Sequence, residues 1–314
     1  MFHKNIILRS YLYKSIKKLY MKKIILALFL FLSFSAYAQE TDTTTVKPVS
    51  PWKLTGSTGV NLSQTSLTNW SAGGENSYAG NAFLNGNIEY KKEKWLWTNT
   101  LVLEYGLTHT ESLGAQKTAD KIDFTTQIGY QINKQWFYSA MADFKSQFAK
   151  GYNYPNKEQY ISKFMAPGYS NISLGIEYKP NDNYSAYFSP VAGKMTFVTD
   201  DSLSNIGAFG VDPGDKFRAE LGAYLKGKAQ REIMENVKLM TDVSFFTAYD
   251  NSFGNVDVEW NVLINMKINK FLNASLNTTL KYDDDVKYVD KSGNIRGARV
   301  QFKEILGVGL AYNF

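Results

Sequence analysis

The chain has 314 residues and no cysteine, so the sequence excludes a disulfide framework and a thiolate metal site. Its formal net charge of +6 points to an acidic partner, yet seven basic residues and no acidic residue lie within residues 1–38. Without that segment, 28 basic and 29 acidic residues remain. The electrostatic basis for binding nucleic acid is then lost, and we expect no nucleic-acid partner.

Residues 1–38 have the pattern of a leader that contains a secretory signal peptide. A positive region at residues 21–23 precedes an apolar run at residues 24–34, and Ala36 and Ala38 provide the small residues of a cleavage site. The apolar run is too short to span a bilayer stably. We therefore expect export and removal of this segment.

The remaining chain divides into a linker and one long domain. We expect residues 1–20 to reflect a start codon assigned in error upstream of the signal peptide. Residues 39–51 (QETDTTTVKPVSP) are polar and punctuated by proline, which is typical of a linker, here a periplasmic one. From residue 52 to residue 314 the pattern is uniform, and we interpret this part as a single β-barrel domain.

Apolar and polar residues alternate with a period of two throughout that domain. In residues 78–90, Tyr78, Leu84 and Ile88 fall on one face, while Asn81 and Asn85 fall on the other. A helix could not keep these sets apart. We expect about twelve such strands, near residues 52–63, 77–90, 95–108, 121–132, 136–148, 169–179, 184–198, 215–227, 237–249, 255–268, 271–282 and 299–314. Most are long enough for a tilted strand to cross a bilayer.

The connections and strand ends favour a closed antiparallel transmembrane β-barrel over a secreted two-sheet sandwich. Short turns alternate with longer segments, as in outer-membrane barrels with short periplasmic turns and long external loops. We expect the longer segments near 64–76, 109–120, 149–168, 199–214 and 283–298, with a long charged turn near 228–236 and a short loop near 250–254 as exceptions. Aromatic residues flank the short turns on the apolar faces, where a girdle at the membrane interface would lie.

The last predicted strand supports the same fold. It ends in Phe314, with Leu306, Val308, Leu310 and Tyr312 on the same face. It must pair with the first strand, because an open sheet edge in hydrocarbon would leave backbone groups unsatisfied. The sequence therefore predicts an all-β barrel in a Gram-negative outer membrane. We expect a monomer whose partners are membrane lipid and the barrel-insertion machinery.

Three separate motifs resemble one protein family. Residues 69–77 (NWSAGGENS), 189–194 (SPVAGK) and 207–214 (GAFGVDPG) are similar to segments of a Bacteroidetes outer-membrane barrel family known as a domain of unknown function, with the signature N-W-x-x-G-G-x-N-S. The resemblance covers nearly the whole predicted domain. It implies a barrel in the outer membrane and brings no substrate or mechanism.

The polar faces of the predicted strands carry nearly balanced charge, which is unlike the one-sided ring of an ion-selective porin. This pattern fits either of two interiors: a narrow polar channel for small solutes, or a closed lumen filled by ion pairs in a scaffold that binds a partner through its loops. The acidic candidates are Glu89, Glu104, Asp123, Asp143, Glu177, Glu220, Asp242, Asp257 and Glu259, and the basic ones are Lys145, Lys179, Arg218, Lys226, Lys238, Lys267 and Lys281.

The glycine-rich segment after the first strand is a candidate mouth loop. It lacks the buried strand and following helix of a phosphate-binding loop. Its glycines allow turns with positive φ, and its amides can bond back to the backbone. We expect it to close over the outer mouth together with residues 207–214, as a structural closure or as a ligand contact. The candidate residues are Asn69, Trp70, Gly73, Gly74, Glu75, Asn76 and Ser77.

Catalysis and specific metal binding find little support. A lipid hydrolase would need a base beside a serine, but His109 and Ser112 do not share a strand face. The aspartate runs at 200–201 and 283–285 lack the ligand spacing of a calcium loop. We therefore expect no enzyme, no cofactor and no metal, with an outer-membrane lipid hydrolase as the minor alternative. A small polar solute and a protein partner both remain open as ligands.

Overall fold

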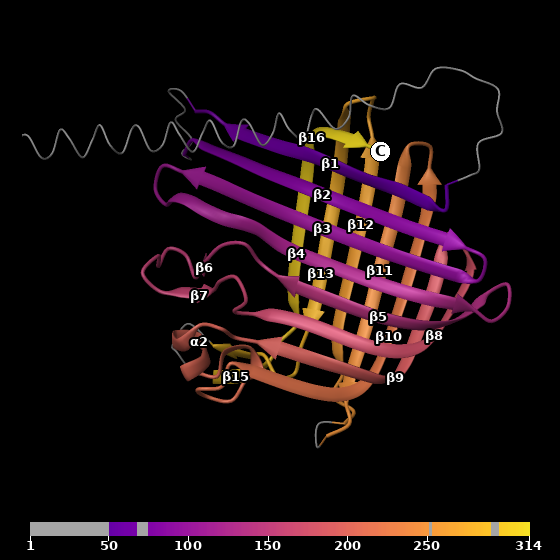
Figure 1. The fold of residues 1–314 in the computed structure, drawn as a ribbon. Helices are drawn as coiled ribbons and strands as arrows, with labels where there is room; N and C mark the ends of the chain where they lie inside the picture. The colour runs from indigo at the N-terminus through magenta and orange to yellow at the C-terminus, as the bar shows by residue number, and fades with distance from the viewer. Residues whose placement is uncertain (1–49, 68–74, 251–252, 290–294) are drawn as a thin grey trace, which may run out of the picture. The chain divides into compact units, whose positions relative to one another are not determined.

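The computed structural model describes residues 50–67, 75–250, 253–289 and 295–314. They belong to one compact unit, Ser50–Phe314, whose strands close into a barrel (Figure 1). Residues 1–49, which hold the predicted leader and nearly all of the predicted linker, lie outside the described residues, so both stay predictions. Within the described ranges, no helix is long and apolar enough to cross a membrane.

Twelve antiparallel strands form the wall of the barrel, and the predicted fold class is confirmed. The chain runs around the wall in sequence order until the last strand pairs with the first. The wall strands are β1 (Trp52–Thr65), β2 (Ser77–Lys92), β3 (Trp95–Thr110), β4 (Gly114–Gln131), β5 (Trp136–Ser146), β8 (Gly168–Asn181), β9 (Tyr184–Phe197), β10 (Phe217–Met234), β11 (Val237–Ala248), β12 (Asp257–Lys267), β13 (Leu272–Tyr282) and β16 (Gln301–Asn313).

The two faces of each strand have opposite character, as the alternation requires. On β16, Leu306 and Leu310 keep 70% and 64% of their side-chain surface exposed on the outside of the barrel. On β5, the alternate residues Ser139, Met141 and Asp143 are buried inside. The wall is therefore apolar outside and largely polar inside, the reverse of a water-soluble protein.

Closure between β1 and β16 completes the wall. The strands pair in register from Ser57 opposite Asn313 to Asn61 opposite Gly309. Beyond this ladder, the Gly56 and Phe314 backbones exchange two N–H···O hydrogen bonds of 2.8 and 3.0 Å. Gly309 lets the two strands approach, because a Cβ there would collide with the carbonyl oxygen of Val60 and the side chain of Asn61.

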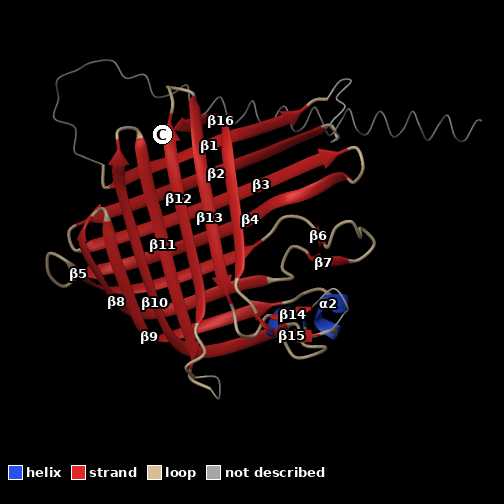
Figure 2. Cartoon of the chain, turned by 180° about the vertical axis from the view of Figure 1, so that it is seen from behind, coloured by secondary structure: helices blue, strands red, loops and turns tan. Residues whose placement is uncertain are grey.

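The two ends of the barrel differ in their connections (Figure 2). Short turns join the strands at one end. At the other end lie the longer connections, which hold small elements that the sequence pattern did not predict: β6 (Gly151–Tyr152), β7 (Tyr160–Ser162), α2 (Asp201–Asn205), η2 (Ala208–Gly210), β14 (Lys287–Val289) and β15 (Ile295–Ala298). These segments contain too few residues for a period to be recognised.

Two predicted connections are wrong in length. The loop expected at 109–120 is a three-residue turn, because β3 and β4 continue past the predicted ends to Thr110 and Gly114. The long charged turn expected at 228–236 shrinks to two residues, because β10 extends to Met234. Charged residues near a strand end are thus part of the wall here. The two-residue turn after Met234 follows the short-turn rule, whereas the turn between Thr110 and Gly114 is an exception among the longer connections.

Closure at Gly309 can be tested by adding one methyl group. We expect Gly309→Ala to destabilise the folded barrel by about 1–3 kcal/mol, the usual cost of overpacking, and to lower the temperature at which it loses its compact mobility in electrophoresis. Gly86→Ala is the matched control, because a Cβ at Gly86 meets nothing within 4 Å. Equal unfolding temperatures for the two variants would contradict this account of closure.

Candidate functional site

The interior of the barrel is the candidate functional site, and its carboxylates are largely buried. Glu104, Asp143, Glu177 and Glu220 are each less than 9% exposed. Burial of a carboxylate is costly unless cations or hydrogen-bond donors satisfy it. The partners of these groups therefore determine how the interior is filled.

Several ion pairs join strands that are not neighbours in the wall. Lys145 on β5 lies 2.9 Å from Glu259 on β12, and four strands separate β5 from β12 along the shorter path around the barrel. Lys303 on β16 pairs with Glu104 on β3 at 3.4 Å, and Lys179 on β8 lies 3.6 Å from Glu89 on β2. These pairs cross the interior and narrow it.

Other predicted interior residues are satisfied locally. Asp143 accepts hydrogen bonds from the backbone N–H and side-chain amide of Asn171 at 3.1 and 3.3 Å. Asp242 accepts from the Asn261 amide at 3.2 Å, and Lys121 pairs with Asp123 at 3.3 Å. These contacts hold side chains against the wall and leave the centre of the barrel to the crossing pairs.

Two predicted lysines lie apart from this network. Lys238 and Lys267 are both exposed, near the short-turn ends of β11 and β12. Neither makes an ion pair with another residue that the structure describes. They therefore stand outside the group of charges that the crossing pairs bring together.

A second charge cluster centres on Lys194, which strict alternation would have turned outward. Its ammonium lies 2.5 Å from Asp257, 3.3 Å from Asp283 and 3.8 Å from Glu220. Arg218 extends the cluster, at 3.0 Å from both Glu220 and Asp285. Asp283 and Asp285, which the sequence places at the start of a longer connection, are thus parts of an ion-pair network.

A bulge in β9 explains why Lys194 faces inward. Before it, the odd-numbered Tyr187 and Ser189 are buried; after it, the even-numbered Ala192 and Lys194 are. The register with β10 shifts at this place, and the Ser189 hydroxyl accepts a 3.2 Å hydrogen bond from Val191 N–H. Pro190 was the available signal, since proline within a strand marks a bulge or an edge.

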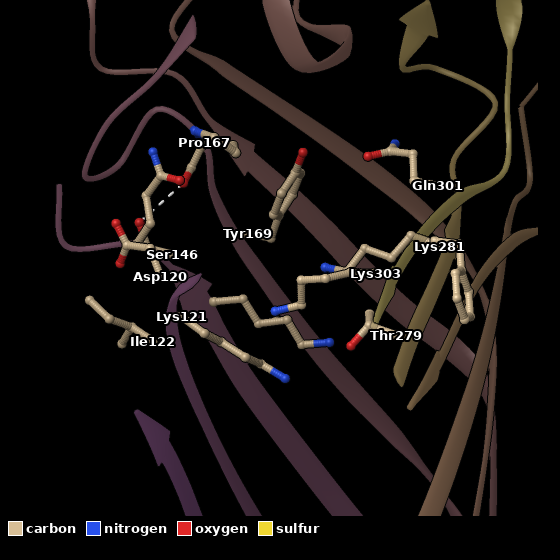
Figure 3. Close-up of a pocket in the computed structure, with 13 residues that line it drawn as sticks. Asp120, Lys121, Ile122, Ser146, Pro167, Tyr169, Thr279, Lys281, Gln301 and Lys303 are labelled. Carbon is tan, nitrogen blue, oxygen red and sulfur yellow. Dashed lines mark hydrogen bonds between the residues drawn. The ribbon is translucent and has the colours of Figure 1, made fainter. Parts of the chain in front are cut away.

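A cavity of about 350 Å³ lies near the end of the barrel that carries the longer connections (Figure 3). Its lining includes Lys121, Lys145, Lys281 and Lys303, together with Tyr169. Figure 3 shows Lys121 and Lys303 extending into the same space from different parts of the wall. Lys121, Lys303 and Tyr169 were not among the sequence candidates, because a single strand gives no indication of which inward residues meet across a barrel.

The described part of the predicted mouth loop is held by the next hairpin. Glu75 accepts hydrogen bonds from the backbone N–H and hydroxyl of Ser112 at 2.8 and 2.9 Å. These bonds lower the pKa of Glu75 below its ordinary value. Asn76 donates to Glu111 at 2.8 Å, and Ser77 begins β2. Asn69, Trp70, Gly73 and Gly74 lie outside the described residues, so closure of the mouth by this loop stays a prediction.

The loop at 207–214 packs elsewhere. Val211 joins a small apolar core with Ala166, Val198 and Leu203, and Phe209 packs against it. The Gly210 carbonyl accepts a 2.8 Å hydrogen bond from Arg218. This loop is thus anchored to the connection that carries β6 and β7 and to the Lys194 cluster. Among the described residues, no hydrogen bond or ion pair links it to Glu75, Asn76 or Ser77.

The residues considered for catalysis and metal binding have other contacts. His109 stacks on Tyr78, with ring centroids 4.7 Å apart and an angle of 7° between the planes, and the Ser112 hydroxyl is bound to Glu75. Within the described ranges, no group of three or more potential ligands is arranged to hold a metal ion.

Asp200 ties the outer connections together. Its carboxylate lies 2.5 Å from the Lys163 ammonium, and accepts hydrogen bonds from the Tyr160 hydroxyl at 2.9 Å and the Leu203 backbone N–H at 3.0 Å. The hydrogen bond from Lys163 is the main cause that lowers the pKa of Asp200 to about 2. The folded state thus gains stability from ionised Asp200 above about pH 4, the usual carboxyl range, and loses it as the pH falls toward 2.

This linkage predicts a pH-dependent response to pepsin. At pH 4 we expect Asp200→Asn to be cut faster than the unmodified chain within residues 147–216, because the neutral amide cannot replace the ionised partner of Lys163. The difference should vanish by pH 2, where Asp200 is largely protonated. Asp201→Asn is the control, because Asp201 is 81% exposed and such ion pairs contribute little. A difference that persists unchanged at pH 2 would contradict the assignment.

Comparison with known proteins gives one family model that matches part of the chain. Residues 62–152 match the model of a family described as "Protein of unknown function (DUF3078)". The expectation of a family of unknown function is confirmed for this segment, and the Bacteroidetes origin and the N-W-x-x-G-G-x-N-S signature stay predictions. No curated protein sequence matches the chain.

Several solved structures align with the chain at low TM-scores and very low sequence identity. An outer membrane channel from Pseudomonas putida F1 aligns with a TM-score of 0.39 and 11% identity, covering 88% of this chain and 100% of that one. The translocator domain of the autotransporter NalP from Neisseria meningitidis gives 0.36 and 9%, covering 94% and 96%. The NanC porin gives 0.35 and 8%, covering 82% and 99%.

Proposed function

We propose that this chain is an outer-membrane β-barrel that forms a narrow polar channel for small solutes. The observation that carries the proposal is the inverted distribution of polarity around a closed wall, together with a lysine-lined cavity inside it. An exposed apolar exterior of this extent needs a lipid environment, and a polar interior in a closed barrel provides a path for water and solutes.

Aromatic residues near the short turns support insertion in a bilayer. Trp52 contacts Tyr90 and Trp97, with ring centroids 4.8 and 5.9 Å apart. Trp136 and Tyr178 form a similar pair at 4.9 Å. Such rings favour the interface between hydrocarbon and water. With the predicted signal peptide, they favour a Gram-negative outer membrane, reached through the barrel-insertion machinery, where the chain acts as a monomer in contact with lipid.

The crossing ion pairs make the proposed channel narrow. The pair between Lys145 and Glu259 joins distant parts of the wall, so its side chains occupy space that a wide pore would leave open. Both side chains keep some contact with solvent, at 20% and 15% exposure. A small solute can pass beside such groups, whereas a large one cannot.

The second candidate is a closed scaffold that binds a partner through its outer connections. Its support is the apolar core of Ala166, Val198, Leu203 and Val211, which gives these connections a defined shape. Neither candidate is an enzyme. Among the described residues, His109 stacks on Tyr78 and the Ser112 hydroxyl donates to Glu75, so this histidine and this serine do not form the pair that a hydrolase would need.

Conductance in planar bilayers tests the channel. We expect small unitary currents from the purified protein and larger ones from the double variant Lys145→Ser/Glu259→Ser, which removes both charges of a crossing pair and leaves Lys281, 45% exposed, to solvent. The control is Lys216→Ser/Asp201→Ser, which removes an exposed pair outside the wall strands and should leave the current unchanged. Absence of current from both the unmodified protein and the double variant, with a stably co-purified protein, would favour the scaffold instead.

A further inference from the structure

We propose that the lysine-lined cavity binds a small oxyanion of the phosphate or carboxylate type. The cavity is the one described above, and its four lysines are Lys121, Lys145, Lys281 and Lys303. The inference deepens the proposed function, on which it rests for its biological role, because it names the class of solute that the interior would accept.

The four lysines reach one space from separate strands. Lys121 and Lys145 belong to the adjacent strands β4 and β5, whereas Lys281 and Lys303 belong to β13 and β16. Three strands separate β4 from β16 along the wall. Only the closure of the barrel therefore brings these ammonium groups to a common cavity (Figure 3).

The charge at the cavity surface is one-sided. Among its lining residues, Asp120 is the single carboxylate. Asp120 is already engaged by Lys117 at 2.7 Å and by the backbone N–H groups of Phe148 and Ala149 at 2.7 and 2.9 Å. Its negative charge is thus directed away from the four lysines and toward its own partners.

Two of the four lysines keep ammonium groups open to the cavity. Lys145 and Lys281 share Glu259, at 2.9 and 3.5 Å. The other two pairs are Lys121 with Asp123 and Lys303 with Glu104. Although each lysine is paired, the side chains of Lys281 and Lys303 remain 45% and 39% exposed. An anion in the cavity could therefore contact them without displacing a buried group.

A neutral hydrogen-bond donor adds to this arrangement. Tyr169 also lines the cavity, and its hydroxyl makes no hydrogen bond to another residue in the described ranges. Donors beside cations are the groups that an oxyanion requires, and such charge-assisted hydrogen bonds are strong.

Equilibrium dialysis with labelled inorganic phosphate tests the site on the full chain, folded in detergent micelles. We expect one saturable site per chain and binding at least about tenfold weaker in Lys281→Gln/Lys303→Gln, as lost hydrogen bonds to charged groups imply. Lys179→Gln is the matched control: Lys179 also forms a crossing pair but does not line the cavity. Competition with acetate, sulfate and chloride at constant ionic strength defines the ligand class.

The outcomes separate this inference from the channel. Saturable phosphate binding without conductance would contradict the proposed channel and support the proposed anion site. Conductance without saturable binding would contradict the anion site and leave the channel proposal standing. Equal affinity in the lysine double variant, or equal displacement by chloride and sulfate, also overturns it. If the double variant lacks the compact mobility of a folded barrel, Lys281→Gln alone serves the same comparison, with its exposed side chain as the reason to expect folding.

Discussion

Every backbone N–H and C=O group of the wall must form its hydrogen bond within the wall, and this need governs the structure. A barrel meets that need only when its last strand pairs with its first, and β16 does so with β1 through a continuous ladder and the bonds between Gly56 and Phe314. Closure then divides the side chains into two sets, because successive residues of a strand point to opposite faces. The outer set is apolar, and the inner set must find its partners inside.

The inward-facing side chains are satisfied mainly by ion pairs with one another. Buried carboxylates such as Glu104 and Glu220 are stable there because cations and amides reach them across the lumen or along the wall. The same pairs link distant strands, so they stiffen the barrel and also narrow its interior. Exposed lysines of this network gather at the lysine-lined cavity, and that cavity is therefore the place that we propose for an external anion.

Alternation was sufficient to predict all twelve wall strands, because a period of two extends over many residues in each. It failed where the backbone breaks the period: the bulge at Pro190 turned Lys194 inward, and strands such as β10 continued through charged residues that resembled a turn. It also could not show which inward residues meet. Glu259 and Lys145 lie 114 residues apart, and only the order and closure of the strands make them partners. The small elements of the outer connections depend on tertiary contacts such as that of Tyr160 with Asp200.

The bulge in β9 has a consequence for how this strand tolerates change. Odd-numbered positions face the interior up to Ser189, and even-numbered positions face it from Ala192 onward. If the strand alternated regularly without the bulge, Lys194 would point out of the barrel, whereas loss of a single residue at 190 or 191 would remove the bulge and keep Lys194 in the inward phase of Tyr187 and Ser189. Amino-acid preferences in related sequences should accordingly exchange their odd–even phase at this point, which makes the two-residue stretch a marker for aligning the strand correctly.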